Sequence, residues 1–348
     1  MRRVMAAALA GGVLLLAAAC SSSSSPAGTS GATNAGTTTS AAAAPVTVRL
    51  GFLENITHAS ALVGLKEGYF TKDLGSAGTL KPTAFSTGTE ETTALLAGQL
   101  DAAYVGPNPA IEAWQKGSSI QIISGAATGG ASIVVKKGIT SAAQLKGKSL
   151  ATPSLGNTQD VALRYWLKQH GLATTSTGGG DVFIKPTKPN SAAVLEFESG
   201  QIAGGSEPAP YDVEMVQDGG TVLLSEPGVT TLLIVTKSFL SAHPAVVADL
   251  VKAQVQANDF IKNNPAAAQT DANAELADYT GKPLKSSVIA ASWKEITFTD
   301  DPDASSLTSD ASEATSLGLL TSVSLSGIFD LGPLNTALAA AGESQVSS

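Results

Sequence analysis

The strongest constraint on the fold is a short apolar strand followed at once by a capped helix, a unit that recurs along the chain. Its clearest copy is 151–167, ATPSLGNTQDVALRYWL. The strand ends in a proline and glycine turn, Asn157 is a suitable N-cap, and Asp160 can reach back to the N–H of that cap. Strands and helices that alternate with short connections predict an α/β fold with open parallel sheets.

The alternation forms two blocks of similar design. The predicted strands are 46–52, 83–86, 100–105, 120–124, 131–136, 149–152, 182–184, 202–206, 221–224 and 231–236. The predicted helices are 59–67, 89–97, 109–116, 141–144, 158–170, 191–199, 212–217, 244–262, 265–279, 285–294, 304–319 and 333–340. At 348 residues the chain is long for a single core. We therefore expect two doubly wound lobes, with 46–136 and 231–348 in lobe 1 and 137–230 in lobe 2.

The N-terminal segment 1–19 has the pattern of an export signal, because two arginines precede a run of small and apolar residues that ends just before Cys20. The place of Cys20 predicts a lipobox, in which the sulfur is acylated after cleavage, although Ala17 departs from the usual leucine. Ordinary cleavage that leaves a free thiol is the alternative. Residues 20–45 are rich in Ser, Thr, Gly and Ala and predict a flexible tether. The expected location is the extracytoplasmic face of the cell membrane, held by a lipid anchor.

The charge balance argues against a nucleic-acid partner. Removal of Arg2 and Arg3 with the signal lowers the basic residues from 21 to 19 against 29 acidic residues, a net charge of −10. No basic stripe is then available to contact phosphates. The remaining arginines are Arg49 and Arg164, so an anionic ligand would be held by at most two guanidiniums together with backbone and hydroxyl donors.

No metal or cofactor is expected. Cys20 is the only cysteine, which excludes an intrachain disulfide and a cysteine-based metal site. The three histidines, His58, His170 and His243, are too scattered to predict a metal site.

Catalysis is not expected either, because the chain has no G-x-S-x-G motif, no P-loop and no paired-carboxylate spacing. Four aspartates near the C-terminus lack the spacing of a calcium loop, and we expect them to lie in a solvated loop. They are Asp300, Asp301, Asp303 and Asp310.

The candidate binding site lies where the strands end, because ligands of open parallel sheets bind outside the carboxyl ends of the strands. The residues at these ends are mostly small, neutral and hydrogen-bonding, and many start helices. They are Asn55, Thr57, His58, Ser86, Gly88, Gly106, Asn108, Thr128, Gly129, Ser154, Asn157, Thr158 and Glu207. A cleft lined in this way can hold a small polar or anionic molecule. The alternative for each residue is that it only caps its helix, and His58 is equally open between a ligand contact and a neighbour of a cap.

Several of these stretches resemble the solute-binding proteins of ABC importers of the nitrate, sulfonate and taurine type. The matching stretches are NITHA at 55–59, AGQLD at 97–101, GPNPA at 106–110, GGAS at 129–132 and GNTQDVALRYWL at 156–167. The resemblance spans about 46–340 and implies a type II periplasmic-binding-protein fold, whose lobes close on the ligand by a hinge of two strands near Ile133 and Leu233. It also implies docking on a membrane permease driven by cytoplasmic ATPase subunits.

One position departs from this resemblance. Such proteins often have Glu-Pro-Trp after the last strand of the second lobe, whereas Ala209 stands here in place of the tryptophan, followed by Pro210 and Tyr211. We expect the change to alter one wall of the pocket.

The resemblance implies a monomeric, lipid-anchored binding protein for a small oxyanion-bearing organic solute, with an aliphatic sulfonate favoured. Binding of a thiamine-type pyrimidine precursor, or signalling to a sensor protein, is the alternative. An enzyme on the same fold is a third reading. The related pyrimidine synthases carry a cysteine-rich iron motif, which a chain with Cys20 alone cannot supply.

Overall fold

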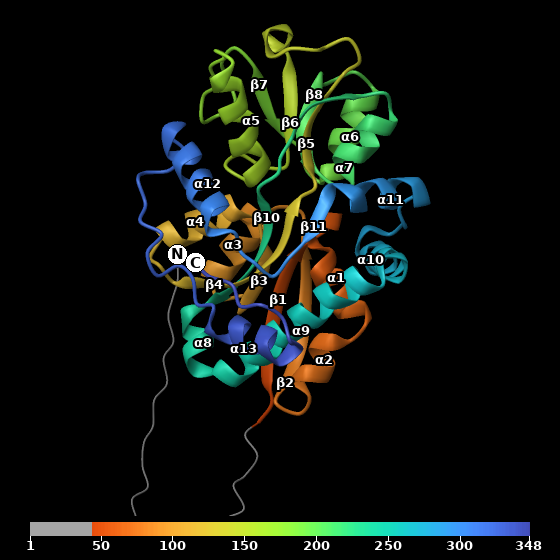
Figure 1. Cartoon of the computed structure of the whole chain (residues 1–348). Coiled ribbons are helices and arrows are strands. Elements are labelled where there is room, and N and C mark those ends of the chain that lie inside the picture. Colours follow the sequence, from red (N-terminus) through yellow and green to blue (C-terminus); the bar gives the residue numbers. More distant parts are fainter. Residues whose placement is uncertain (1–43) are drawn as a thin grey trace, which may run out of the picture. The chain divides into compact units, whose positions relative to one another are not determined.

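The computed structural model describes residues 44–348 (Figure 1). The expected export signal, Cys20 and nearly all of the expected tether lie outside the described residues. Within 44–348, no helix combines the length and the apolar character needed to cross a membrane.

The first sheet of the described chain has six strands in the order β11-β4-β10-β3-β1-β2. β1 (Val46–Leu53) runs parallel to β2 (Gly78–Phe85) and to β3 (Ala102–Val105). β10 (Val229–Thr236) lies between β3 and β4 (Ile120–Gly129) and is antiparallel to both, and β11 (Ile296–Phe298) is antiparallel to β4. The expectation of an open parallel sheet is therefore wrong at β10 and β11, which run opposite to the other four strands. β10 runs the opposite way because it enters the sheet from the second lobe.

The second sheet of the described chain has five strands in the order β7-β6-β8-β5-β9. β6 (Ser149–Thr152) runs parallel to β7 (Phe183–Pro186) and to β8 (Gly204–Pro208). β5 (Ala131–Val135) is antiparallel to β8 and to β9 (Thr221–Ser225). Strand 131–135, which the sequence analysis assigned to lobe 1, thus belongs to the second sheet.

The chain passes between the sheets at two places, after β4 and after β9. Gly129 ends β4 in the first sheet, and β5 begins at Ala131 in the second. Gly129 and Gly130 have φ values of +71° and +73°, which disfavour any side chain. A Cβ on Gly130 would also lie 2.4 Å from Cγ1 of Ile296. Ile133 and Leu233, near which the hinge was expected, pair inside the second and the first sheet respectively.

Helices cover both faces of each sheet, as expected for alternating strands and helices. On one face of the first sheet the core includes α1 (Ala59–Lys66), α2 (Tyr69–Leu74), α9 (Pro244–Asn263), α10 (Pro265–Thr280) and α13 (Gly332–Ala341). On its other face lie α3 (Gly88–Leu96), α4 (Pro107–Gln115) and α12 (Ala304–Ser316). The second sheet packs against α5 (Thr158–Gln169) on one face and against α6 (Asn190–Glu198) and α7 (Tyr211–Gln217) on the other. The remaining elements are η1 (Ile56–His58), η2 (Ala142–Leu145), α8 (Lys237–Ala242) and α11 (Ser286–Glu295).

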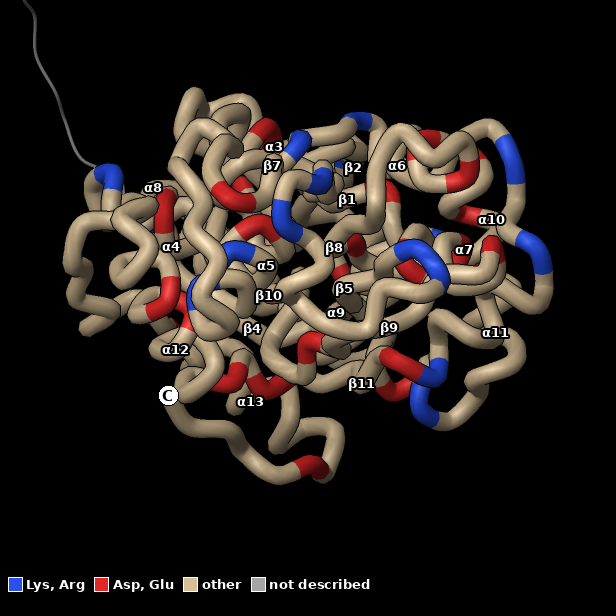
Figure 2. The backbone as a smooth tube through the Cα atoms, turned by 90° about the horizontal axis from the view of Figure 1, so that it is seen from above, with Lys and Arg blue, Asp and Glu red and all other residues tan. Residues whose placement is uncertain are grey.

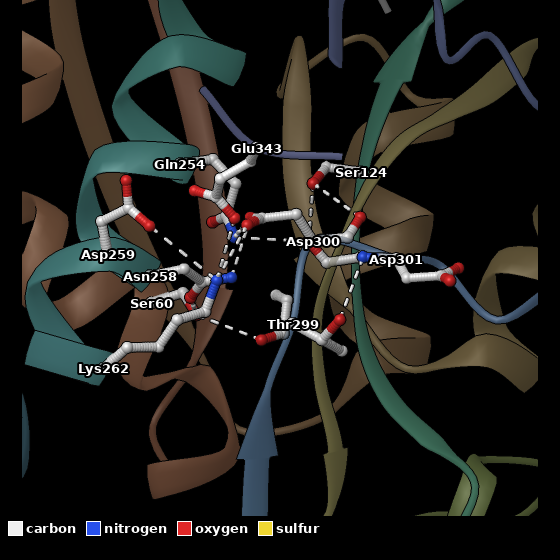
Figure 3. Close-up of polar contacts among 12 residues, drawn as sticks. Ser60, Ser124, Gln254, Asn258, Asp259, Lys262, Thr299, Asp300, Asp301 and Glu343 are labelled. Carbon is white, nitrogen blue, oxygen red and sulfur yellow. Dashed lines mark hydrogen bonds and ion pairs between the residues drawn. The ribbon is translucent and has the colours of Figure 1, made fainter. Parts of the chain in front are cut away.

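The expectation of a solvated acidic loop near the C-terminus is wrong for Asp310, which lies in α12 with a buried Oδ2. It is also wrong for Asp300, which is 4% exposed. Its Oδ1 accepts hydrogen bonds from Nε2 of Gln254 at 3.1 Å and from Nδ2 of Asn258 at 2.8 Å (Figure 3). Nζ of Lys262 lies 3.7 Å from Oδ2. The two amides come from α9, whose register against β11 the sequence pattern did not reveal.

The network around Asp300 extends to other elements of the first lobe. Oδ1 of Asn258 accepts a hydrogen bond from Oγ of Ser60 at 2.6 Å, and Oε1 of Gln254 accepts one from the hydroxyl of Tyr104 at 2.7 Å. These bonds join α1, β3 and the end of β11 to α9. A buried carboxylate that receives several hydrogen bonds can remain in the core, where an unpaired one would be costly.

We expect Asp300→Asn to flatten the dependence of stability on pH. Burial raises the pKa of Asp300 to about 6, against about 3.9 in an unfolded chain. Its stabilising contribution is therefore fully present below about pH 4 and is lost as the pH rises through about 6. Asparagine keeps an oxygen for the two amides without a charge, so the free energy of unfolding, measured by urea denaturation, should vary less between these pH values.

Asp278→Asn is the control, because the side chain of Asp278 is 70% exposed. An unchanged pH dependence in Asp300→Asn would contradict the role given to this carboxyl.

Candidate functional site

A cavity lies between the strand ends of the two lobes. Its walls come from the ends of β1, β2 and β3, from the start of α5, and from the second-lobe strand β8. The lining residues are Leu53, Asn55, Thr57, His58, Ser86, Thr87, Gly88, Gly106, Pro109, Pro153, Asn157, Thr158, Gln159, Asn190, Pro208 and Thr230. The space open to the centre of a water-sized sphere is about 20 Å³, which is close to the room for one water molecule.

Most of the residues singled out from the sequence are brought together here. Those that line the cavity are Asn55, Thr57, His58, Ser86, Gly88, Gly106, Asn157 and Thr158. They come from both lobes and from segments about 100 residues apart, and they meet because parallel strands end at the same edge of their sheet.

The other expected site residues do not line the cavity. Thr128 and Gly129 are held in β4, where Thr128 pairs with Val229 and Thr297. Asn108 turns toward α12, where its Nδ2 donates to the carbonyl oxygen of Asp310 at 3.4 Å.

Ser154 and Glu207 differ in where they lie. Oγ of Ser154 is 3.1 Å from Oγ1 of Thr89 in the opposite lobe, so Ser154 joins the lobes beside the cavity. Glu207 is fully buried in β8, where it pairs with Ser132 of β5. Successive side chains of a strand point to opposite faces, so the next residue, Pro208, lines the cavity and Glu207 does not.

Some lining residues were missed by the sequence analysis. They are Leu53, Thr87, Pro109, Pro153, Gln159, Asn190, Pro208 and Thr230. Thr87 and Gln159 flank expected residues, and Asn190 begins α6, so the helix-start signal could have found it. Thr230 lies on the returning strand β10, and no local pattern indicates that this strand passes the site.

Two helix N-termini from opposite lobes face the cavity. α3 begins at Gly88, and Oγ1 of Thr87 accepts a hydrogen bond from the N–H of Glu90 at 3.3 Å. α5 begins at Thr158, and Oδ1 of Asn157 accepts one from the N–H of Asp160 at 3.0 Å. Free N–H groups and the positive dipole end make such positions favourable for an anion.

The sequence predicted that the Asp160 side chain accepts a hydrogen bond from the N–H of Asn157, and this prediction is wrong. Oδ2 of Asp160 accepts from the N–H of Gly156 at 2.7 Å, whereas the N–H of Asn157 donates to the carbonyl oxygen of Ser154. The same carboxylate pairs with Nε of Arg164 at 2.7 Å, and both side chains are almost fully buried. Asp160 therefore fixes both the loop before α5 and its first turns.

Neither arginine that was considered for anion binding reaches the site. Arg164 is held by Asp160 and also donates to the carbonyl oxygen of Thr175. Nε of Arg49 donates to Oδ2 of Asp101 at 2.8 Å, on a different part of the first lobe. The described lining contains no lysine, arginine, aspartate or glutamate, so its polarity is that of neutral donors and acceptors.

His58 is a neutral donor in this wall. Its side chain is 1% exposed, and burial lowers its pKa to about 3. Nδ1 accepts a hydrogen bond from the N–H of Leu53 at 3.2 Å, so the hydrogen of the neutral ring is assigned to Nε2. The imidazole thus offers one N–H and no charge near neutral pH.

Two buried polar atoms at the cavity have no hydrogen-bond partner among the described residues: Oγ1 of Thr158 and Oδ1 of Asn190. Buried polar atoms are normally paired, so these atoms are suited to a ligand. Gly106 makes room for the threonine, since a Cβ there would lie 2.4 Å from Oγ1 of Thr158.

We expect Asp160→Asn to destabilise the protein by about 3 to 5 kcal/mol, because it leaves the buried guanidinium of Arg164 without its counter-charge. The matched control is Glu112→Gln, which breaks the exposed pair with Lys116 at the same helical spacing. That change should cost about 0.5 kcal/mol or less. Urea denaturation measures both, and equal losses in the two variants would contradict the importance of the buried pair.

The structure is similar to solved proteins of the periplasmic-binding-protein type. The alkanesulfonate-binding protein SsuA from Xanthomonas axonopodis pv. citri, bound to MOPS, matches with a TM-score of 0.70 at 18% identity over 84% of this chain and 100% of that one. The periplasmic nitrate-binding protein NrtA from Synechocystis PCC 6803 matches with a TM-score of 0.70 at 14% identity, over 85% and 89% of the two chains. A ligand-binding component of an ABC-type import system from Staphylococcus aureus, with zinc bound, matches at 0.69 and 15%, over 84% and 99%.

These similarities confirm the expected fold, an α/β periplasmic-binding-protein fold of two lobes. Comparison with curated protein sequences finds no significant match. The model of the NMT1-like family matches residues 41–277, more than half of the chain. The chain therefore belongs to the NMT1-like family.

Proposed function

We propose that the protein is the extracytoplasmic solute-binding component of an ABC importer. It would capture a small oxyanion-bearing organic solute between its lobes and deliver it to a permease with cytoplasmic ATPase subunits. The similar proteins support the role, since they are named as binding proteins or as a component of an import system. Their named ligands differ, so the ligand of this chain is argued from its own cavity.

The observation that carries the proposal is the uncharged, donor-bearing wall of the interlobe cavity. The starts of α3 and α5 line this cavity together with His58 and Thr158, and Oγ1 of Thr158 has no hydrogen-bond partner among the described residues. Each helix end contributes roughly 0.3 to 1 kcal/mol toward a facing anion. Neutral donors suit a singly charged group with several acceptor oxygens, and a sulfonate has both properties, which makes an aliphatic sulfonate the favoured ligand.

Ligand entry requires the lobes to separate. The cavity has room for little more than a water molecule, and contacts between the lobes close it. Thr89 and Ser154 meet across the cleft, and Nζ of Lys188 pairs with Oε1 of Glu90. The hydroxyl of Tyr211 in α7 also donates to the carbonyl oxygen of Glu54 at 2.8 Å. A cycle of opening, binding and closure fits a protein that presents its cargo to a transporter.

The position that departs from the resemblance lies away from the wall. Ala209 is fully buried in the first-lobe core, where its N–H donates to the carbonyl oxygen of Gly130 and its own carbonyl accepts from Ile56. Pro208 supplies this part of the lining instead.

We propose no catalytic role for this site. A general base should have a pKa near the working pH, and the pKa of about 3 of His58 leaves it neutral and poorly basic.

Anchoring at Cys20, a location on the extracytoplasmic membrane face and a monomeric state complete the proposal, and they rest on the sequence pattern of the first 45 residues and on the family resemblance. Along the described backbone, the positions of Lys and Arg are interspersed with those of Asp and Glu (Figure 2).

We expect the full-length protein in mild detergent to be stabilised selectively by alkanesulfonates in a thermal-shift panel. The panel also contains taurine, sulfate, nitrate, phosphonates and thiamine-type pyrimidines. Ligand at 100 times its dissociation constant adds about 2.7 kcal/mol to the folded state, a shift of several degrees. A shift only with a pyrimidine would move the function to uptake of a vitamin precursor, and a shift only with divalent sulfate would contradict the argument from neutral donors.

We expect Asn157→Asp to weaken binding of the anion about tenfold or more. Aspartate caps a helix as well as asparagine does, but it places a negative charge at the helix end that faces the cavity. Isothermal titration with the best ligand of the panel measures the affinity, and thermal unfolding without ligand checks the fold. Unchanged affinity would remove the start of α5 from the site.

A further inference from the structure

A larger cavity lies on the other side of the segment that returns to the first lobe. It is bounded by α5, by residues 226–228 between β9 and β10, by the start of β10, and by α12, which contacts α5 (Figure 1). The space open to the centre of a water-sized sphere is about 440 Å³, enough for a small organic molecule. Thr158 and Thr230 line both cavities and form the partition between them.

One part of the wall is aromatic and aliphatic. Tyr165 and Trp166 face the cavity from α5, and Leu224 and Val229 face it from the strands. Such a wall stabilises an apolar group, and the faces of tyrosine and tryptophan also attract cations.

The remainder of the wall is acidic. Glu226, Asp310 and Glu313 line the cavity, and no lysine or arginine of the described chain does. Glu226 is 9% exposed, and its one side-chain hydrogen bond within the described residues is from Oγ of Ser206 to Oε1, at 2.7 Å. Oδ2 of Asp310 is buried and has no hydrogen-bond partner among the described residues.

These carboxyls lack a counter-charge where they lie. Burial raises the pKa of Glu226 to about 7, and burial together with the neighbouring Glu313 and Glu226 raises the pKa of Asp310 well above its usual range. The described residues contain no group of three or more His, Cys, Asp or Glu side chains placed to hold a metal ion, so a single metal does not fit these carboxyls. A cation that carries its charge at one end and an apolar body at the other matches both parts of the wall.

We propose that this cavity is a second binding site, and that it takes a small organic monocation such as an arylalkylammonium. The ammonium group would donate to Glu226 and Asp310, and the ring would pack against Trp166 and Tyr165. The site shares Thr158 and Thr230 with the interlobe cavity and differs from it in its other lining residues, in charge and in size. The inference does not rest on the proposed transport function.

The test compares three probes of similar shape and different charge on the full-length protein at about pH 8. They are 2-phenylethylammonium, 2-phenylethanol and 3-phenylpropanoate, and isothermal titration measures their affinities. We expect the ammonium to bind at least about tenfold more tightly than the alcohol, because charge-assisted hydrogen bonds are stronger than neutral ones. The propanoate should show no binding. Equal affinity for the ammonium and the alcohol, or no binding of the ammonium, would overturn the proposal.

Charge-neutral variants locate the site. Glu226→Gln and Asp310→Asn should each weaken 2-phenylethylammonium about tenfold, while Asp278→Asn, at an exposed position of α10, should leave its affinity unchanged. Thermal unfolding shows whether each variant is folded, and the ratio of ammonium to alcohol affinity within one variant is independent of its stability. A ratio that stays at the wild-type value in both cavity variants would place the cation elsewhere and overturn the assignment.

Discussion

The Asp160 carboxylate holds the start of α5 in place, and the interlobe site depends on that position. Its Oδ2 accepts hydrogen bonds from the N–H of Gly156 and from Nε of Arg164. Its Oδ1 accepts a hydrogen bond from Oγ1 of Thr152 at 3.4 Å. A charge with so many partners can remain buried, and it keeps the helix end rigid without a charged residue at the cavity itself. The N–H groups at that end of the helix are then available to a ligand in the cavity between the lobes.

The two cavities near the lobe boundary have walls of different charge and polarity. On one side of Thr158 and Thr230 the walls are neutral and donate hydrogen bonds, and on the other side they combine aromatic rings with carboxyls. Arg49 pairs with Asp101 and Arg164 pairs with Asp160. The first cavity therefore has no arginine in its wall, and the carboxyls of the second cavity have no arginine as a counter-charge. The two cavities therefore differ in their local electrostatics, although they belong to one negatively charged chain.

Some of the buried carboxyls lie beside the places where the chain passes between the sheets. Glu207 in β8 is fully buried, and burial together with Asp212 and Glu226 raises its pKa well above the usual range. Neither of its side-chain oxygens has a partner among the described residues. The carboxyls beside the passage are thus poorly solvated, which is costly for the charged form and favours protonation.

The sequence by itself determined most of the order of strands and helices, several helix caps and the strand ends that line the interlobe cavity, but it missed α2, α8 and β11. These features are local: a cap is set by residues three apart, and the alternation of apolar strands and amphipathic helices can be read within one segment. It also determined half of the residues that line the first cavity, because parallel strands bring their carboxyl ends to one edge. Only the tertiary structure decided that β5 belongs to the second lobe, that Arg164 is held by Asp160, that Asp300 is buried and that Thr230 reaches the site. Strand partners, buried ion pairs and the path of a returning strand are set by which segments pack together, and no local pattern of residues records that choice.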